Sequence, residues 1–104
     1  MTKVIHTPGD CHIRISGHAG AGVKGNDLVC AAVSALSWTL LSSVIEYPEY
    51  NVQYSIDPEE GVMDIRCDPE EEAKDICRYL FGIIAGGLSL LADKYPEYVQ
   101  FEGR

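Results

Sequence analysis

A glycine-rich segment in the first third of the chain, SGHAGAGVKGND, stands between a strand-like stretch and a long apolar run. Gly20, Gly22 and Gly25 break regular structure here, so the segment predicts a loop over residues 19–26. The alanine- and serine-rich run that follows predicts a helix over residues 27–46. The chain must therefore turn from a strand into a helix through this loop.

Cys30 falls close to the start of the predicted helix. Asn26 or Asp27 can cap that helix, because a short side-chain oxygen accepts a hydrogen bond from an amide left unpaired at a helix start. Either cap puts Cys30 in the first turn, where the helix dipole favours a thiolate and cysteine pKa values commonly fall to about 3.5–7.5. The same amides could hold the oxyanion of a tetrahedral intermediate. The position therefore suits a nucleophile.

His18 follows the predicted strand and lies on the far side of the glycine-rich loop from Cys30. It is the nearby residue able to take the thiol proton and return it to a leaving group. A Cys30/His18 dyad points to acyl transfer, most simply peptide hydrolysis. The alternative is that Cys30 is a buried core cysteine and His18 an ordinary loop histidine.

The other three cysteines read as small core hydrophobes. Cys11 lies on a predicted strand, Cys67 ends another, and Cys77 falls on the apolar stripe of the second predicted helix. The chain has no CxxC pair, so neither a zinc ribbon nor a thioredoxin-like centre is indicated. The loop also lacks the Lys-Ser/Thr ending of a phosphate-binding P-loop. We therefore expect no metal and no other cofactor.

Composition limits the kind of protein this is. The 104 residues, 46% of them apolar, suffice for a single domain over residues 1–104. A formal net charge of −8 argues against nucleic-acid binding. The beginning MTKVIH is not a signal segment, and the run LSWTLLSSVI is too short and serine-rich to span a bilayer. We expect reduced thiols, a cytoplasmic location and no membrane partner.

The periodicity predicts an α+β fold with a small, mainly antiparallel sheet packed against two helices. The second helix carries an Asp68, Pro69, Glu71 capping signature. The first helix is apolar almost all round, so it should be buried on most sides. The predicted order is strand 2–7, strand 11–16, helix 27–46, strand 50–56, strand 62–67, helix 69–94 and edge strand 98–102.

Three glycines interrupt the second predicted helix, and each costs up to roughly 1 kcal/mol of helix propensity relative to alanine. They are Gly82, Gly86 and Gly87. Another backbone, such as that of a second subunit, would explain them by approaching closely there. The alternative is a kink.

The segment GHAG, the glycine-containing loop and GNDLVCAAVSAL together resemble the signature of the ribosomal-processing cysteine protease family, Prp. The match includes Gly17, His18, Asp27, Cys30 and Ser34, with the spacing between histidine and cysteine. The rest of the chain agrees with the family in length and element order only. The resemblance implies that Cys30 is the nucleophile and His18 its base.

The family resemblance also implies a substrate and an assembly. Prp proteins remove a short N-terminal extension from the large-subunit ribosomal protein numbered twenty-seven, so a ribosomal protein precursor is the expected partner. The cut follows a phenylalanine, which implies a peptide groove with an aromatic pocket beside Cys30, bordered by the loop of Gly20, Gly22 and Gly25. The resemblance further implies a homodimer. Asp27 either orients His18 or caps the helix, and Ser34 either supports the site or allows close packing.

Alternative functions remain open at the level of sequence. Related sequences occur in bacteriophages, where the target would be a capsid precursor. A non-enzymatic module could use the glycine-rich loop to bind a peptide or a ribosomal surface, with Cys30 inert. A thiol-dependent hydrolase of small molecules would need an enclosed pocket, whereas a protease needs an open groove.

Overall fold

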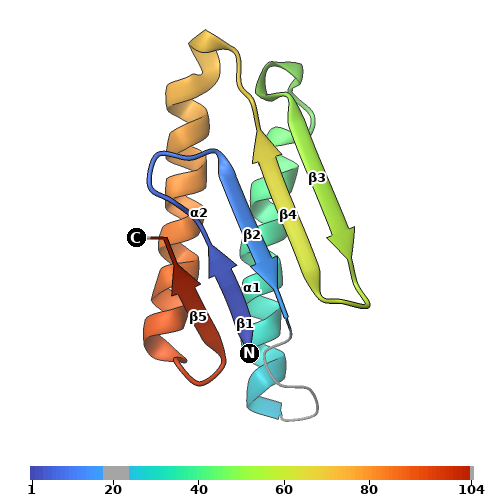
Figure 1. Cartoon of the computed structure of the whole chain (residues 1–104), viewed down its shortest axis with the longest axis vertical. Helices are drawn as coiled ribbons and strands as arrows, with labels where there is room; N and C mark the ends of the chain where they lie inside the picture. Colours follow the sequence, from blue (N-terminus) through green and yellow to red (C-terminus); the bar gives the residue numbers. More distant parts are fainter. Residues whose placement is uncertain (18–23, 104) are drawn as a thin grey trace.

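The protein forms two layers, a five-stranded sheet and two helices that cover one of its faces (Figure 1). The computed structural model describes residues 1–17 and 24–103, with the backbone alone for residues 24–27. This confirms the predicted α+β fold. The elements in chain order are β1 (Thr2–Ile5), β2 (His12–Ser16), α1 (Lys24–Val44), the 3₁₀ turn η1 (Pro48–Tyr50), β3 (Val52–Asp57), β4 (Val62–Cys67), the 3₁₀ turn η2 (Glu71–Ala73), α2 (Lys74–Lys94) and β5 (Val99–Glu102).

The sheet has the strand order β3-β4-β2-β1-β5. Three of its four pairings are antiparallel, and the fourth joins β1 to β5 in parallel, with Thr2 opposite Val99. The parallel pair is possible because α2 carries the chain back along the sheet before β5 begins. The predictions of a mainly antiparallel sheet and of a closing edge strand are both confirmed.

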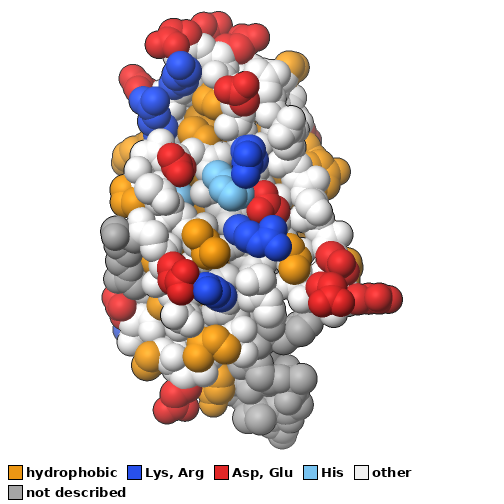
Figure 2. All heavy atoms as spheres, in the orientation of Figure 1, with side chains coloured by type: hydrophobic (Ala, Val, Ile, Leu, Met, Phe, Trp, Pro, Cys, Tyr) orange, Lys and Arg blue, Asp and Glu red, His pale blue; other side chains and the backbone are white. Residues whose placement is uncertain are grey.

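The two faces of the sheet differ in polarity. In β2, Ile13 and Ile15 point towards the helices and are buried, whereas His12 and Arg14 point to the uncovered face. Figure 2 shows this uncovered face, on which basic, acidic and histidine side chains are intermixed. The predicted alternation in this strand is confirmed, and it tells which face packs against the core.

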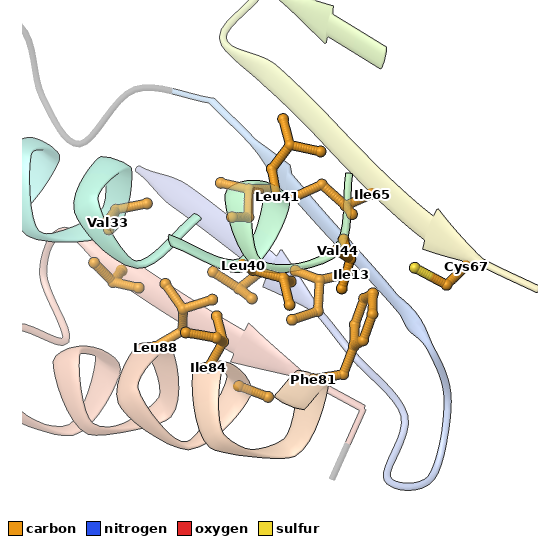
Figure 3. Close-up of a cluster of buried hydrophobic side chains, with 14 of the residues drawn as sticks. Ile13, Val33, Leu40, Leu41, Val44, Ile65, Cys67, Phe81, Ile84 and Leu88 are labelled. Atoms are coloured by element: carbon orange, nitrogen blue, oxygen red, sulfur yellow. The ribbon is translucent and has the colours of Figure 1, made fainter. Parts of the chain in front are cut away.

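The core fills the space between the sheet and the two helices (Figure 3). Each large apolar side chain buried here contributes roughly 1.5–3 kcal/mol relative to an exposed one. The side chains labelled in Figure 3 are Ile13, Val33, Leu40, Leu41, Val44, Ile65, Cys67, Phe81, Ile84 and Leu88.

Helix α1 begins earlier than predicted, at Lys24 rather than residue 27, and ends at Val44. Gly25 and Asn26 therefore belong to the first helical turn and not to the loop. The predicted cap at Asn26 or Asp27 is wrong, because both residues already lie inside the helix. Helix propensity alone would have ended the helix at the glycine, but packing of the following apolar stripe outweighs that cost.

The prediction that α1 is buried on most sides is also wrong. One stripe of it, including Val29, Val33 and Leu40, faces the core, and the opposite side is exposed because no second layer covers it. Its exposed hydroxyls bond to the helix's own backbone. Thr39 Oγ1, for example, donates to the carbonyl of Ala35 at 2.6 Å. Thr39 and Ser42 thus mark a solvated side of α1, whereas Ser37 is buried.

Helix α2 follows the 3₁₀ turn η2 and is not capped as predicted. Ala73 occupies the N-cap position without a side-chain hydrogen bond, and Glu71 pairs with Lys74 at 2.8 Å instead. The predicted Asp68, Pro69, Glu71 signature is therefore wrong, because a 3₁₀ turn stands where the first α-helical turn was expected.

The glycines of α2 have two different surroundings, and the helix continues through all three. A Cβ at Gly87 would lie 3.1 Å from the side chain of Leu36, so this glycine lets α1 and α2 pack closely within one chain. Gly82 and Gly86 face open space. The predicted close approach is therefore intramolecular at Gly87 and has no partner within the described chain at Gly82 and Gly86.

Helix α2 is also apolar over most of its length. The helical stretch Glu71–Lys94 is long and apolar enough to cross a membrane by length and composition, whereas the sequence pattern points only to the shorter run LSWTLLSSVI as a membrane candidate. Core helices of soluble proteins pass the same test. Only 33% of its most apolar window is buried, by residues that include Phe81 and Leu88, so much of its apolar surface lies outside the core.

Candidate active site

Cys30 lies in the second turn of α1 and is half-buried. The prediction of a first-turn cysteine is wrong, since the helix starts at Lys24. In a regular helix the Cys30 amide pairs with the carbonyl of Asn26, and the unpaired amides belong to the turn before. The oxyanion role inferred from the sequence therefore cannot be given to the Cys30 amide itself.

A groove of about 320 Å³ runs beside Cys30. Its first wall is a face of α1, where Cys30, Ser34, Ser37 and Trp38 recur at the spacing that brings side chains onto one side of a helix. Val33 lines the groove from the same helix. The remaining lining comes from the N-terminal segment and from the β3–β4 hairpin: Thr2, Ile15, Gly17, Ile56, Asp57, Pro58, Gly61, Val62 and Met63.

The hairpin wall opposite α1 is largely apolar. Ile56 and Met63 are cross-strand partners, so their side chains project from the same face of the sheet. Asp57 accepts a hydrogen bond from the amide of Glu60 at 3.2 Å, which holds the hairpin turn. Trp38 faces this wall from α1 and is 53% exposed. The groove therefore offers an apolar slot with an aromatic side, which suits a large apolar side chain.

Gly17 directly follows β2 and lines the same groove as Cys30. Its φ angle of +87° is one that other residues rarely adopt, and a Cβ at this position would collide with the Met1 carbonyl. Glycine is therefore required for this strand end to pass beside β1. It is also the last described residue before His18 in the sequence.

The structure places only some of the residues that the sequence predicts for the site. Cys30 and Ser34 both line the groove, Ser34 one turn further along α1. His18, Gly20 and Gly22 lie outside the described residues, as does the side chain of Asp27. Gly25 is in the first turn of α1 and not in a loop. The Cys30/His18 dyad remains a prediction.

Several groove residues were not predicted. Ser37 and Trp38 follow Cys30 by two helical turns, so helical spacing measured from the cysteine could have found them. Ser37 is buried, and its hydroxyl donates to the Val33 carbonyl at 2.7 Å, which leaves Ser34 as the more exposed hydroxyl of this wall. Nothing in the sequence connects the β3–β4 hairpin with Cys30, because that contact depends on the tertiary fold.

The other thiols are core groups, as predicted. Cys77 is fully buried, Cys67 is nearly so, and Cys11 packs against the same core. Burial raises the pKa of Cys67 to about 11, although a hydrogen bond with Cys77 acts in the opposite direction. Burial also raises the pKa of Cys77, with further contributions from Cys11 and Cys67. Among the residues the structure describes, no three potential ligands are placed to hold a metal ion.

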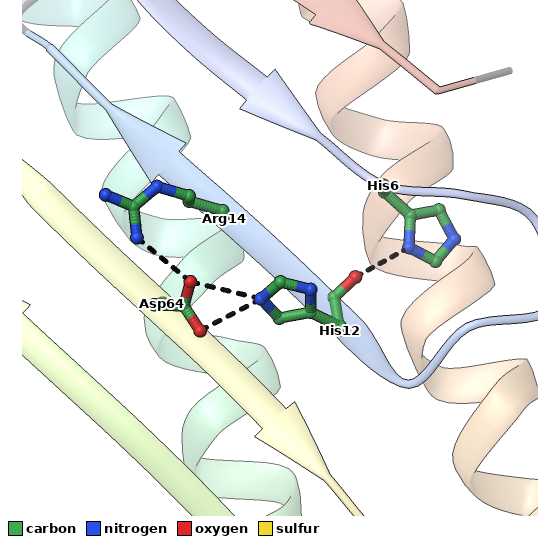
Figure 4. A network of polar contacts seen from close by, with 4 residues as sticks. All are labelled: His6, His12, Arg14 and Asp64. Atoms are coloured by element: carbon green, nitrogen blue, oxygen red, sulfur yellow. Dashed lines mark hydrogen bonds and ion pairs between the residues drawn. The ribbon is translucent and has the colours of Figure 1, made fainter.

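A second histidine forms an ion pair on the uncovered face of the sheet (Figure 4). His12 Nε2 lies 2.9 Å from Asp64 Oδ1, and Arg14 donates to the same carboxylate at 3.1 Å. Partial burial acts to raise the pKa of Asp64, but the bonds from His12 and Arg14 outweigh it and hold this pKa below its ordinary value. These residues do not line the groove, so the pair belongs to the sheet surface and not to the candidate site.

Comparison with known families identifies the family of the chain. The profile of the family described as cysteine protease Prp matches residues 3–100, nearly the whole chain. The chain belongs to the cysteine protease Prp family. It is therefore a cysteine protease, as the sequence predicted. No curated protein sequence matches it at a significant level.

Solved structures share the Prp fold over the whole chain. The essential ribosomal processing protease Prp from S. aureus, in complex with a covalently linked product peptide, has 22% identity, full coverage of both chains and a TM-score of 0.81. With a substrate peptide the values are 21%, full coverage of both chains and 0.80. SMU.848 from Streptococcus mutans is 30% identical over 97% of this chain and 90% of its own, with a TM-score of 0.78. The likeness to the S. aureus structures concerns the fold.

Proposed function

We propose that Cys30 attacks a peptide bond held in the groove between α1 and the β3–β4 hairpin, with His18 as its base. The thiolate adds to the scissile carbonyl carbon. The carbon–nitrogen bond then breaks as His18 returns the proton to the leaving amine, and water hydrolyses the thioester. The observation that carries this proposal is the half-buried Cys30 in a groove that also contains Gly17, the neighbour of His18 in the sequence.

The proposed substrate is the precursor of the large-subunit ribosomal protein numbered twenty-seven, from which a short N-terminal extension is removed in the cytoplasm. Membership of the Prp family supports this, as does the fold shared with a ribosomal processing protease that binds a substrate peptide. An open groove suits an extended chain better than a small molecule. A net charge of −8 is compatible with a basic partner.

Trp38, Ile56 and Met63 are the side chains we assign to the pocket for the apolar residue before the cut. They lie on opposing walls of the groove, and an aromatic ring placed between them would bury apolar surface on both sides. Ser34 is assigned a supporting role at the same wall, because it lies one turn from Cys30 and is exposed. Asp27 is assigned the role of orienting His18, because its position inside α1 excludes the capping role.

The test is cleavage of the ribosomal precursor, followed by intact-mass spectrometry. The natural enzyme should make one N-terminal cut, and Cys30→Ala and His18→Ala should each reduce the rate by roughly 10³-fold or more, as loss of a nucleophile or base does in comparable enzymes. Cys11→Ser is the matched control, because Cys11 is also half-buried but lies at the other end of β2.

The controls separate the parts of this proposal. Cleavage of the precursor that survives Cys30→Ala would refute the nucleophile. An intact precursor after incubation with the natural enzyme would refute the ribosomal substrate. A peptide library with one varied residue before the cut then tests the pocket, where Trp38→Ala should weaken selection for aromatic side chains more than it weakens cleavage itself.

We further propose that the chain functions as a homodimer. The support comes from the large apolar side chains on the outer side of α2, which the chain's own core leaves uncovered. Light scattering over a dilution series tests this directly. It should give twice the 11.4 kDa mass of the chain at high concentration, and a mass that stays at one chain would refute it.

A further inference from the structure

Three of the four cysteines of the chain gather at the end of the core that lies away from the groove. Cys11 directly precedes β2, Cys67 ends β4 (Figure 3), and Cys77 lies at the start of α2. The groove, by contrast, meets β2 at its opposite end, next to Gly17. The thiol cluster of Cys11, Cys67 and Cys77 is therefore a second group of reactive side chains, which peptide cleavage does not use.

The register of β2 and β4 makes Cys11 and Cys67 neighbours. His12 is opposite Arg66, so Cys11 is opposite Cys67, and the Cys67 amide donates to the Cys11 carbonyl at 2.8 Å. Both cysteines face the core, because they alternate with residues on the uncovered face of the sheet. In antiparallel strands, a pair bonded in this way holds its Cα atoms about 5.5 Å apart, wider than the roughly 4.5 Å of the other kind of pair.

Cys77 brings the third thiol onto this pair from α2. Its thiol is in hydrogen-bond contact with the thiols of both Cys11 and Cys67. A disulfide needs two side chains that already point towards each other, because displacement of the backbone stores strain in the bond. Cys77 meets this condition for both neighbours, whereas Cys11 and Cys67 stand in the wider pair geometry. Cys77 is therefore the thiol best placed to join another.

The three thiols differ in their access to solvent. Cys77 is 0% exposed and Cys67 is 7% exposed, whereas Cys11 is partly exposed. Cys11 also follows an exposed turn, residues 7–10, in which the Asp10 amide donates to the Thr7 carbonyl at 2.9 Å. Oxidation of a cysteine requires that the oxidant reach the sulfur. A small oxidant can therefore meet Cys11 in the folded protein, while its two neighbours stay enclosed.

We propose that Cys11 is a site of oxidation by hydroperoxides, and that Cys77 converts the oxidised sulfur into a Cys11–Cys77 disulfide. The Cys11 sulfur attacks the peroxide. A sulfur–oxygen bond forms, the oxygen–oxygen bond breaks, and the other oxygen leaves with the thiol proton as an alcohol, or as water from hydrogen peroxide. The Cys77 sulfur then attacks the Cys11 sulfur, and the hydroxide leaves with the Cys77 proton as water. The two thiols lose two electrons, and one peroxide gains them.

The disulfide joins the start of β2 to the start of α2, two segments that are distant in the sequence. A cross-link over so long a loop restricts the unfolded chain and so stabilises the folded one. The groove stays open, because the bond lies at the other end of β2 from Gly17. Peroxide therefore produces a form of the protein that is harder to unfold, and a dithiol reverses the change.

The pairing is tested by peptide mapping of the Cys30→Ala variant after treatment with hydrogen peroxide, so that the groove thiol does not compete. Trypsin cuts after lysine and arginine, which puts the three cysteines in separate peptides, residues 4–14, 67–74 and 75–78. Without reduction, peptide 4–14 should be linked to peptide 75–78, and dithiothreitol should separate them. A link from peptide 67–74 to either of the others, or no link at all, would overturn the proposed disulfide.

The order of the two steps is tested in the same Cys30→Ala background. Adding Cys77→Ala should stop the reaction at the sulfenic acid of Cys11, which dimedone traps as an adduct on peptide 4–14. Cys67→Ala is the matched control, because it removes the other thiol in contact with Cys77 and should leave the disulfide intact. A dimedone adduct on Cys67 in place of Cys11, or a disulfide lost equally in Cys67→Ala and Cys11→Ser, would contradict the proposed roles.

The stabilising effect is measured by urea denaturation of the Cys30→Ala protein before and after peroxide. The midpoint should rise by about 1 M on oxidation and return with dithiothreitol. Cys11→Ser in the same background should show no rise, and it should fold because Cys11 is only partly buried. A midpoint that stays the same or falls in protein shown to carry the disulfide would overturn the stabilising role.

Discussion

Cys30 and Cys77 lie on the two helices of one small protein, in opposite surroundings. Cys30 is half-buried and borders an open groove with Ser34 and Trp38. Cys77 is fully buried near Cys67, where desolvation disfavours the thiolate and raises its pKa. The comparison shows that the surroundings of a cysteine on its helix, and not the residue type, separate a candidate nucleophile from a packing group.

The sharpest test of this contrast is alkylation by iodoacetamide at pH 7. A thiol with a pKa of about 11 is roughly 300-fold less ionised than a free thiol with a pKa of about 8.5. Cys67 and Cys77 should therefore be labelled at least 100-fold more slowly than Cys30, and burial will slow them further. Peptide mass spectrometry of a labelling time course measures the rates. Comparable labelling of Cys77 in the folded protein would break the comparison.

Substitution should affect stability in the opposite order, with a larger loss at Cys77 than at Cys30. Cys77→Ser places a hydroxyl in the core and should lower the free energy of unfolding by about 1–3 kcal/mol. Cys30 borders the groove, so Cys30→Ser should change the free energy of unfolding by less than about 1 kcal/mol. Urea denaturation at pH 7 under reducing conditions measures both. Equal losses would show that Cys30 is as much a core residue as Cys77.

Alkaline pH provides a finer test of the buried thiols. Cys67 has a pKa of about 11 in the folded protein, so the unfolded chain, with a thiol pKa near 8.5, releases its proton first. The stabilising difference is complete below about pH 8.5 and is lost as pH rises towards 11, with a slope of up to about 1.4 kcal/mol per unit for each such thiol. Denaturation midpoints of Cys67→Ala between pH 8 and 10.5 should fall less steeply than those of the natural protein.

The smallest effect is expected on the uncovered face of the sheet. His12→Ala removes one partner of Asp64 and should cost about 0.5–1 kcal/mol at neutral pH, because the group is partly solvated. The natural pair loses its contribution as pH falls below the ordinary carboxyl pKa of about 4, since Asp64 has a lowered pKa. Peptide cleavage should be unchanged, and a large loss of cleavage would place this face in the mechanism.

Local patterns predicted the elements well where side chains alternate cleanly. The run VMDIRC corresponds to β4 without shift, because apolar and polar residues alternate and the turn DPEEG precedes it. The start of α1 was misplaced by three residues, because Gly25 and Asn26 read as loop residues and packing keeps them helical. The order of the strands depends on contacts between distant residues, which periodicity does not report.

The candidate site, like the fold, was predictable only where the signal is local in the sequence. Cys30 could be singled out because its chemistry is local, whereas Ser34 was indicated by the resemblance to the Prp signature. The apolar wall of Ile56 and Met63 could not, since the hairpin reaches the groove only after the sheet has formed. Trp38 was passed over because a tryptophan in an apolar helix reads as core, whereas the uncovered side of α1 leaves it 53% exposed.

The parallel pairing of β1 with β5 has a consequence for the order in which the groove is completed. Thr2 lines the groove and donates its amide to the Tyr98 carbonyl at 2.8 Å, so this wall of the groove depends on a residue near the end of the chain. During synthesis the outer edge of β1 stays unpaired until Val99–Glu102 has emerged from the ribosome. A chain that has not yet added Tyr98 and β5 therefore lacks the backbone hydrogen bonds that hold this wall of the groove in place.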